Sequence, residues 1–149
     1  MVVVTTVALT FKSFSVGYAG IYDTYGTKIN IRIELVVSKP IILKKQQEWC
    51  DGKTVLDYSY PTNQPRTEVG TYVYEEKDYA HIPFRLPFSL LGHMYKIRFE
   101  YLDTTDNLTY SVEAQARFFT PEEIMALALG TAAGACVLTL TVTKWLKWW

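Results

Sequence analysis

The chain has 149 residues, of which 49% are hydrophobic and 20% are charged. This composition is that of a folded domain, and it excludes an intrinsically disordered chain and a collagen-like repeat. Fifteen basic residues balance fifteen acidic ones, so the chain has no excess charge with which to bind nucleic acid or an acidic surface.

The first eleven residues, MVVVTTVALTF, are rich in β-branched side chains. No basic residue precedes Lys12, so this run lacks the positively charged start of a signal peptide. Valine and threonine favour extended backbone, and the run therefore predicts a β-strand.

Three further segments alternate apolar and polar residues with a period of two, which is typical of strands with one buried face. These segments are residues 29–37, 95–101 and 108–118. The turn-forming sequence DTTDN at 103–107 joins the second segment to the third. The two together predict an antiparallel hairpin.

Weaker strand patterns bring the predicted number of strands to about eight. They occupy residues 41–43, 53–58, 67–74 and 80–84. No helical periodicity of useful length precedes Thr120, which argues against an α/β enzyme fold. We therefore expect an all-β domain over residues 1–119, built as a two-sheet antiparallel sandwich of the jelly-roll or immunoglobulin-like type.

The start of a helix follows at Thr120. Thr120 is the expected N-cap, Pro121 occupies the first helical position, and Glu123 completes a capping box. Phe119 and Ile124 occupy the two positions of a hydrophobic staple. The pattern predicts a helix that begins directly after the β-domain.

No charged residue occurs from Ile124 to Thr143. A helix of this length spans about 30 Å, the thickness of the hydrocarbon core of a bilayer. The chain then ends in residues that favour the membrane interface, namely Lys144, Trp145, Lys147, Trp148 and Trp149. We expect residues 120–149 to form a C-terminal transmembrane helix. The alternative is a buried helix of a soluble domain, which explains the apolar run but not its tryptophan and lysine ending.

Small residues recur every four positions within the predicted span, at Ala126, Gly130 and Gly134. They share one helix face, and such a stripe lets two membrane helices approach closely. The stripe predicts a helix-packing surface. Glycine and alanine are also common in membrane helices that make no such contact, so both interpretations stay open.

Motifs for catalysis are missing from the sequence. It has no phosphate-binding loop, dinucleotide fingerprint or nucleophile elbow, and its potential metal ligands are scattered singly. We therefore expect that the protein is not an enzyme and that it has no catalytic residue, no cofactor and no metal site. The alternative is an enzyme in which Cys50 is the nucleophile and His81 or His93 its base.

Two surface features are compatible with binding. Eleven tyrosines can line a protein or sugar interface, although strands favour tyrosine in any case. Asn107 begins an Asn-Leu-Thr glycosylation sequon at the predicted hairpin turn. A glycan there would require export of the β-domain.

In its overall plan, a β-domain over 1–119 followed directly by a membrane helix over 120–149, the chain resembles the β-sandwich capsid proteins of icosahedral viruses that contain a lipid membrane. The resemblance implies a structural protein of the virion that links a protein shell to the internal membrane. Its partners would be the lipid bilayer and other subunits of the assembly, including further copies of this chain, with no specific binding of nucleic acid. The alternative is a single-span adhesion or receptor-binding protein on a cell membrane, displayed outward.

Overall fold

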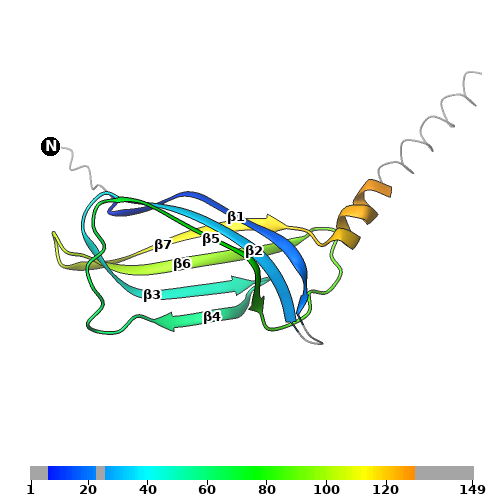
Figure 1. Ribbon diagram of the computed structural model, residues 1–149, viewed down its shortest axis with the longest axis horizontal. Coiled ribbons are helices and arrows are strands. Elements are labelled where there is room, and N and C mark those ends of the chain that lie inside the picture. The colour runs from blue at the N-terminus through cyan, green and yellow to red at the C-terminus, as the bar shows by residue number, and fades with distance from the viewer. Residues whose placement is uncertain (1–6, 23–25, 130–149) are drawn as a thin grey trace, which may run out of the picture.

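Strands form most of the structure. The computed structural model describes residues 7–22 and 26–129 of the chain (Figure 1). Within them, seven strands precede one short helix at 121–129. The strands are β1 (Leu9–Tyr22), β2 (Gly26–Val37), β3 (Ile41–Cys50), β4 (Lys53–Ser59), β5 (Gly70–Ile82), β6 (His93–Asp103) and β7 (Leu108–Phe118).

The strands form two antiparallel sheets, as the sequence predicted. One sheet has the order β1-β2-β5 and the other the order β4-β3-β6-β7. The sheets lie face to face, and the edge strands β1 and β7 run beside each other across the sandwich (Figure 1). Three hairpins, β1-β2, β3-β4 and β6-β7, each stay within one sheet.

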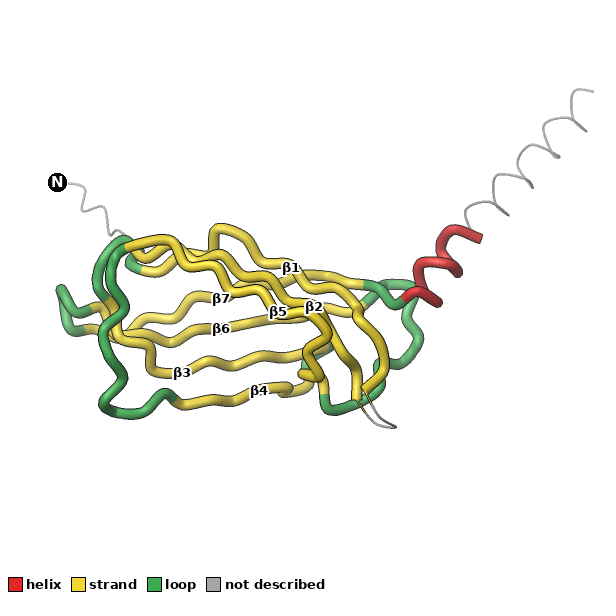
Figure 2. The backbone as a smooth tube through the Cα atoms, in the orientation of Figure 1, coloured by secondary structure: helices red, strands yellow, loops and turns green. Residues whose placement is uncertain are grey.

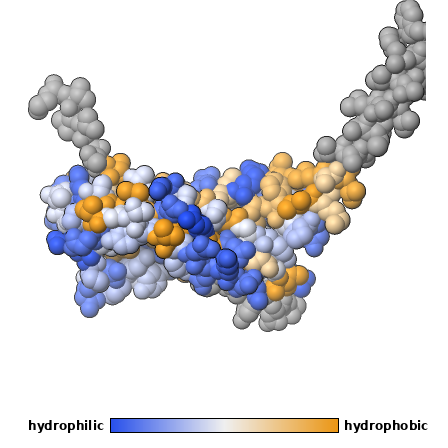
Figure 3. Space-filling view, turned by 45° about the horizontal axis from the view of Figure 1, so that its top comes forward, coloured by the Kyte–Doolittle hydropathy of each residue, from blue (hydrophilic) through white to orange (hydrophobic). Residues whose placement is uncertain are grey.

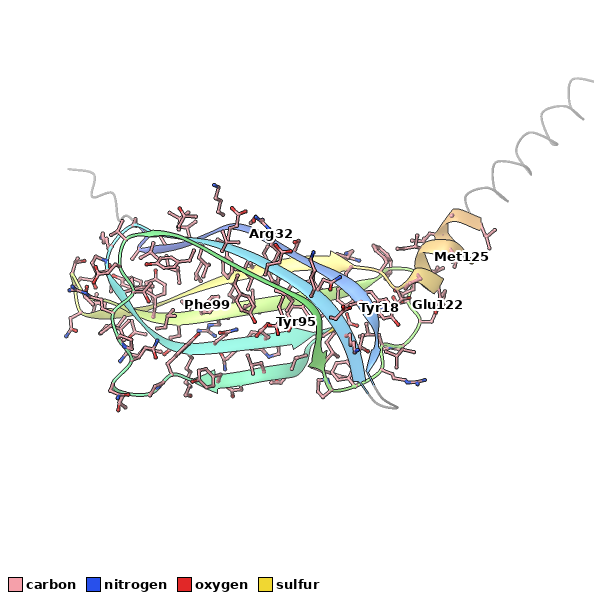
Figure 4. All side chains as sticks on the ribbon, viewed as in Figure 1. Tyr18, Arg32, Tyr95, Phe99, Glu122 and Met125 are labelled. Atoms are coloured by element: carbon pink, nitrogen blue, oxygen red, sulfur yellow. The ribbon has the colours of Figure 1, made fainter. Side chains whose placement is uncertain are left out.

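A hydrophobic core fills the space between the sheets. Every second residue of β6 is buried, which confirms the predicted alternation. Aromatic side chains span the gap, with ring centroids 5.8 Å apart for Phe11 and Phe99 and 6.3 Å apart for Phe14 and Tyr95. Tyr95 and Phe99 lie between the two layers (Figure 4). These contacts hold the sheets together through burial and aromatic packing.

β1 extends further than the predicted strand. It runs from Leu9 to Tyr22 and pairs with β2 over its whole length, whereas the prediction ended at Phe11. A register shift between Phe11 and Ser13 moves the alternation by one residue. Because a bulge changes which residues face inward, the alternation of apolar and polar residues could not be followed past Phe11 in the sequence.

β3 is also longer than predicted, at ten residues in place of three. Its second half reads as polar in sequence, yet Glu48 is only 2% exposed. The Tyr95 hydroxyl donates to Glu48 Oε1 and the Gln46 amide donates to Oε2, each at 2.9 Å. These hydrogen bonds allow a carboxylate to occupy an inward position of a central strand.

The described residues contain seven strands and not eight, because the segments predicted at 67–74 and 80–84 belong to the single strand β5. Asp78 has a positive φ of 55°, and its backbone N–H donates to Asn30 Oδ1 at 2.9 Å. The pairing with β2 shifts register at the same place. A bulge therefore stands where the sequence suggested a break.

The predicted hairpin is confirmed. β6 ends at Asp103 and β7 begins at Leu108, and these two residues pair. Asp103 Oδ1 accepts hydrogen bonds from the backbone N–H and the hydroxyl of Thr105. Leu108 was expected on the inward face but is 57% exposed, because it directly follows the turn at the tip of the sandwich.

The two ends of the sandwich differ. The β3-β4 turn, the connection from β5 to β6 and the helix lie at one end, which we call the helix end (Figure 2). The β6-β7 turn and the connection from β4 to β5 lie at the other, the hairpin end.

Candidate functional site at the helix–sandwich junction

The helix begins with a capping box that is buried in the sandwich. The backbone N–H of Thr120 donates to Glu123 Oε1 at 2.8 Å, and the N–H of Glu123 lies 3.4 Å from Thr120 Oγ1. Glu123 is fully buried and Thr120 is 9% exposed. The box satisfies early backbone donors of the helix, which contributes about 1 kcal/mol in comparable proteins.

Glu123 also joins the helix to two other elements. Its Oε2 atom lies 2.7 Å from the backbone nitrogen of Ser89, in the β5-β6 connection, and 2.7 Å from Nε2 of His93, the first residue of β6. Burial raises the pKa of Glu123, but the N–H groups of Thr120 and Ser89 and the His93 ring outweigh it, so the net pKa is lowered. The carboxylate is therefore the ionised form in the folded protein at neutral pH.

His93 stands between two carboxylates. Its Nδ1 atom lies 2.7 Å from Asp51 Oδ2 and its Nε2 atom 2.7 Å from Glu123 Oε2, and its side chain is fully buried. Each ring nitrogen therefore lies within hydrogen-bonding distance of one carboxylate oxygen, and the ring contacts both acids. We call Asp51, His93 and Glu123 the junction triad.

Asp51 is held by the turn in which it lies. Asp51 and Gly52 have φ angles of 51° and 81°, the left-handed conformation that an Asp-Gly turn adopts between antiparallel strands. Asp51 exchanges two further hydrogen bonds with the backbone of Met94, both at 3.0 Å. The triad thus ties the β3-β4 turn to β6 and β6 to the helix.

Gly92 lets the β5-β6 connection pass close under the end of β7. Its φ is 76°, and a Cβ atom there would lie 2.8 Å from the Phe119 ring and 2.9 Å from the carbonyl oxygen of Phe118. Beside it, the Arg117 guanidinium donates to the carbonyl oxygen of Leu91. Only glycine fits this position without strain.

Sequence reasoning found the helix cap but missed most of the junction. Thr120 and Glu123 were predicted as a pair from their spacing, whereas Asp51, Ser89, Gly92 and His93 were not assigned to this site. The Asp-Gly pair at 51–52 is a turn signal that could have placed Asp51. No local signal links His93 to its two partners, which lie 42 and 30 residues away in the chain.

The geometry gives no support to the alternative of a Cys50 nucleophile. Cys50 is fully buried, and burial together with the neighbouring Asp51 raises its pKa to about 12. Both ring nitrogens of His93 face carboxylates. The side chain of His81 lies outside the described residues. Among the residues that the structure describes, no group of three acidic, histidine or cysteine side chains could hold a metal ion.

The remaining predicted sites are placed only in part. Asn107 lies at the tip of the β6-β7 hairpin, exposed and with a φ of 59°, at the end opposite the helix. Ala126 is half-buried in the helix. The other predicted packing and interface residues lie outside the described residues, namely Gly130, Gly134, Lys144, Trp145, Lys147, Trp148 and Trp149.

Only residues 124–129 of the predicted membrane span are described. The structure contains, within 7–22 and 26–129, no helix that is both long enough and apolar enough to cross a membrane. The described turns carry exposed apolar side chains, with Ile124, Met125 and Leu129 between 56% and 64% exposed.

The fold and the junction define the class of this protein as a two-sheet β structure with a helix fixed at one end. In comparisons with known proteins, no family model matches the chain and no curated protein matches it significantly.

Proposed function

We propose that this is a non-enzymatic structural protein in which a C-terminal transmembrane helix holds a β-sandwich at a lipid membrane. The sandwich would belong to a protein shell, such as a virion capsid, and the helix would link that shell to the membrane. Its partners are then the bilayer and other subunits of the assembly, including further copies of the chain.

One observation carries the proposal, namely the fixed start of the helix. Glu123 is fully buried and contacts Thr120, Ser89 and His93, so the first helical turn belongs to the sandwich. The sequence then continues without a charged residue to Thr143. A rigid connection of this kind suits a protein that transmits position between a membrane and a shell, because a flexible linker would not fix their relative orientation.

Of the two sandwich types that the sequence predicted, the strand order favours the immunoglobulin-like one. Its three hairpins each remain within one sheet. A jelly roll instead has eight strands in all, arranged as two Greek keys. In it, the connections between consecutive strands pass from one sheet to the other. The membrane-linking role does not depend on this choice, since function resides in sites and not in folds.

Flotation with vesicles tests the proposal. The full chain, reconstituted in phosphatidylcholine vesicles, is expected to float with the lipid after alkaline washing. A variant that ends at Leu129 keeps the whole junction triad but lacks most of the uncharged run, so we expect it to remain in the dense fractions. Equal flotation of the two proteins would show that residues 130–149 are not the anchor.

A second candidate function is outward display as an adhesion or receptor-binding protein. It is favoured by the position of Asn107 at the hairpin end and by the exposed Tyr72 and Tyr74 of β5, which are 42% and 52% exposed. Glycan mass on Asn107 of the native protein would establish export and favour this alternative. An unmodified Asn107 would favour the shell protein.

A further inference from the structure

Exposed hydrophobic side chains gather around the base of the helix. Of the fifteen large hydrophobic residues exposed in the described parts of the chain, eight lie at the helix end or on the helix. Figure 3 shows hydrophobic residues concentrated where the helix leaves the sandwich. We call the following six the apolar collar: Ile21, Phe88, Leu90, Leu91, Ile124 and Met125.

The collar combines three segments of the chain. Phe88, Leu90 and Leu91 come from the β5-β6 connection, and they are 62%, 52% and 77% exposed. Ile21 is the penultimate residue of β1, and it lines a pocket of about 230 Å³ together with Phe88 and residues of the helix start. Clustered exposure of this kind is uncommon on a soluble surface and marks a contact with a partner.

The connection holds its leucines outward by a fixed backbone. The backbone N–H of Ser89 donates to Glu123, and that of Gly92 donates to the carbonyl oxygen of Ser89 at 3.1 Å. The Arg117 guanidinium donates to the carbonyl oxygen of Leu91. Because the backbone is already ordered, burying these side chains against a partner costs little further conformational entropy.

The geometry points to the surface of a lipid bilayer as the partner of the apolar collar, with Phe88, Leu90 and Leu91 inserted beside the helix as a second membrane contact. This inference rests on the proposed function. The uncharged run begins at Ile124, one residue after the carboxylate that holds Ser89. If residues 124–143 span the hydrocarbon core of the bilayer, Leu90 and Leu91 lie at the boundary of that core.

Charge does not select the lipid. Arg85 and Glu122 both line the pocket next to the collar (Glu122 is labelled in Figure 4). Their opposite charges cancel, and a single guanidinium, that of Arg117 at the Leu91 carbonyl oxygen, adds little attraction to anionic headgroups, so burial of apolar area is the main source of binding. Neutral phosphatidylcholine is therefore expected to suffice.

Spin-label accessibility in the full chain tests the inference. A nitroxide is attached at Leu91→Cys, with Cys136→Ser in the background and Cys50 left in place because it is fully buried. The matched control is Leu108→Cys, an exposed leucine at the hairpin end. In phosphatidylcholine vesicles, oxygen should relax the label at position 91 more than a water-soluble nickel chelate does, with a depth of about 5–10 Å. The label at 108 should show the reverse.

Flotation of the same samples separates the possible failures. A chain that floats while both labels are equally accessible to nickel would overturn the collar contact and leave the anchor intact. A label at 91 shielded from both relaxing agents, with spin–spin broadening, would show that a second copy covers the collar and would also overturn the inference. Absence of flotation would overturn the anchor and the collar together. Phe88→Cys repeats the measurement at a second position, so that a local disturbance at 91 does not decide the result.

Discussion

At the scale of single residues, Glu123 has the most consequential position in the molecule. One oxygen completes the capping box with Thr120, and the other accepts hydrogen bonds from Ser89 and His93. A single carboxylate thus determines where the helix begins and how it is joined to the sandwich. Its neighbour Glu122 is exposed.

Acid should weaken the fold through Glu123. Its pKa is lowered in the folded protein from an ordinary value of 4.5. As pH falls, the unfolded state therefore takes up a proton before the folded state does. Above the pKa of the unfolded state, Glu123 makes its full contribution to the free energy of unfolding. That contribution is lost as pH falls through the lower native pKa. In detergent micelles at pH 7, we expect the free energy of unfolding of Glu123→Gln to be about 3–5 kcal/mol lower than that of the parent protein, because the substitution breaks the buried pair of Glu123 and His93. The variant should also lack the loss of stability at acidic pH that Glu123 causes.

Glu122→Gln is the matched control for this measurement. It removes an adjacent carboxylate that makes none of the junction contacts, so its pH profile of thermal unfolding should follow that of the parent protein. Similar profiles for the two variants would contradict the role given to Glu123.

The helix cap is the part of the site that the sequence could predict. Thr120 and Glu123 are three residues apart, and this spacing alone predicted their capping pair. The contact of Glu123 with His93 depends on strand pairing, because His93 pairs with Phe118 across β6 and β7 and so lies near the start of the helix. Local patterns carry no information about such distant partners.

At the scale of elements, the bounds of the strands could be predicted where the alternation is uninterrupted. β6 and β7 keep one register along their whole length, and the hairpin between them was predicted correctly. β1, β3 and β5 each contain a register shift. Since a bulge moves the alternation by one residue, the predicted strands covered only parts of these three.

Two glycines in turns make it possible to measure two costs of an added Cβ atom separately. One is the cost of close packing in the β5-β6 connection, and the other is the cost of a left-handed backbone. Gly52 and Gly92 both have positive φ, but only Gly92 has atoms, those of Phe118 and Phe119, close to the position of a Cβ. We expect Gly52→Ala to cost about 1–2 kcal/mol through the left-handed backbone alone. Gly92→Ala should cost distinctly more in thermal unfolding of the full chain in detergent micelles. Equal losses would show that Gly92 is not tightly packed under β7.

At the scale of the whole molecule, the sandwich is neutral and its two ends differ in character. Residues 1–120 contain thirteen basic and thirteen acidic residues, and the remaining two of each sign flank the uncharged run. The order of strands within the sheets could not be predicted, because alternation tells which face of a strand is buried but not which strand lies beside it. The apolar collar could not be predicted either, because the sequence does not tell which segments lie side by side. The collar combines residues of β1, the β5-β6 connection and the helix.

We propose that the helix fixed by Glu123 continues into a membrane. A charge in the middle of the proposed span tests it most directly. Ala133→Arg, in the full chain, should reduce the fraction that floats with phosphatidylcholine vesicles after alkaline washing, because arginine at the centre of a membrane helix costs about 2.5–3.5 kcal/mol. Ala133→Leu, the matched control, should float as the parent protein does. Equal flotation of the arginine variant and the parent would show that Ala133 does not lie in a membrane-spanning helix.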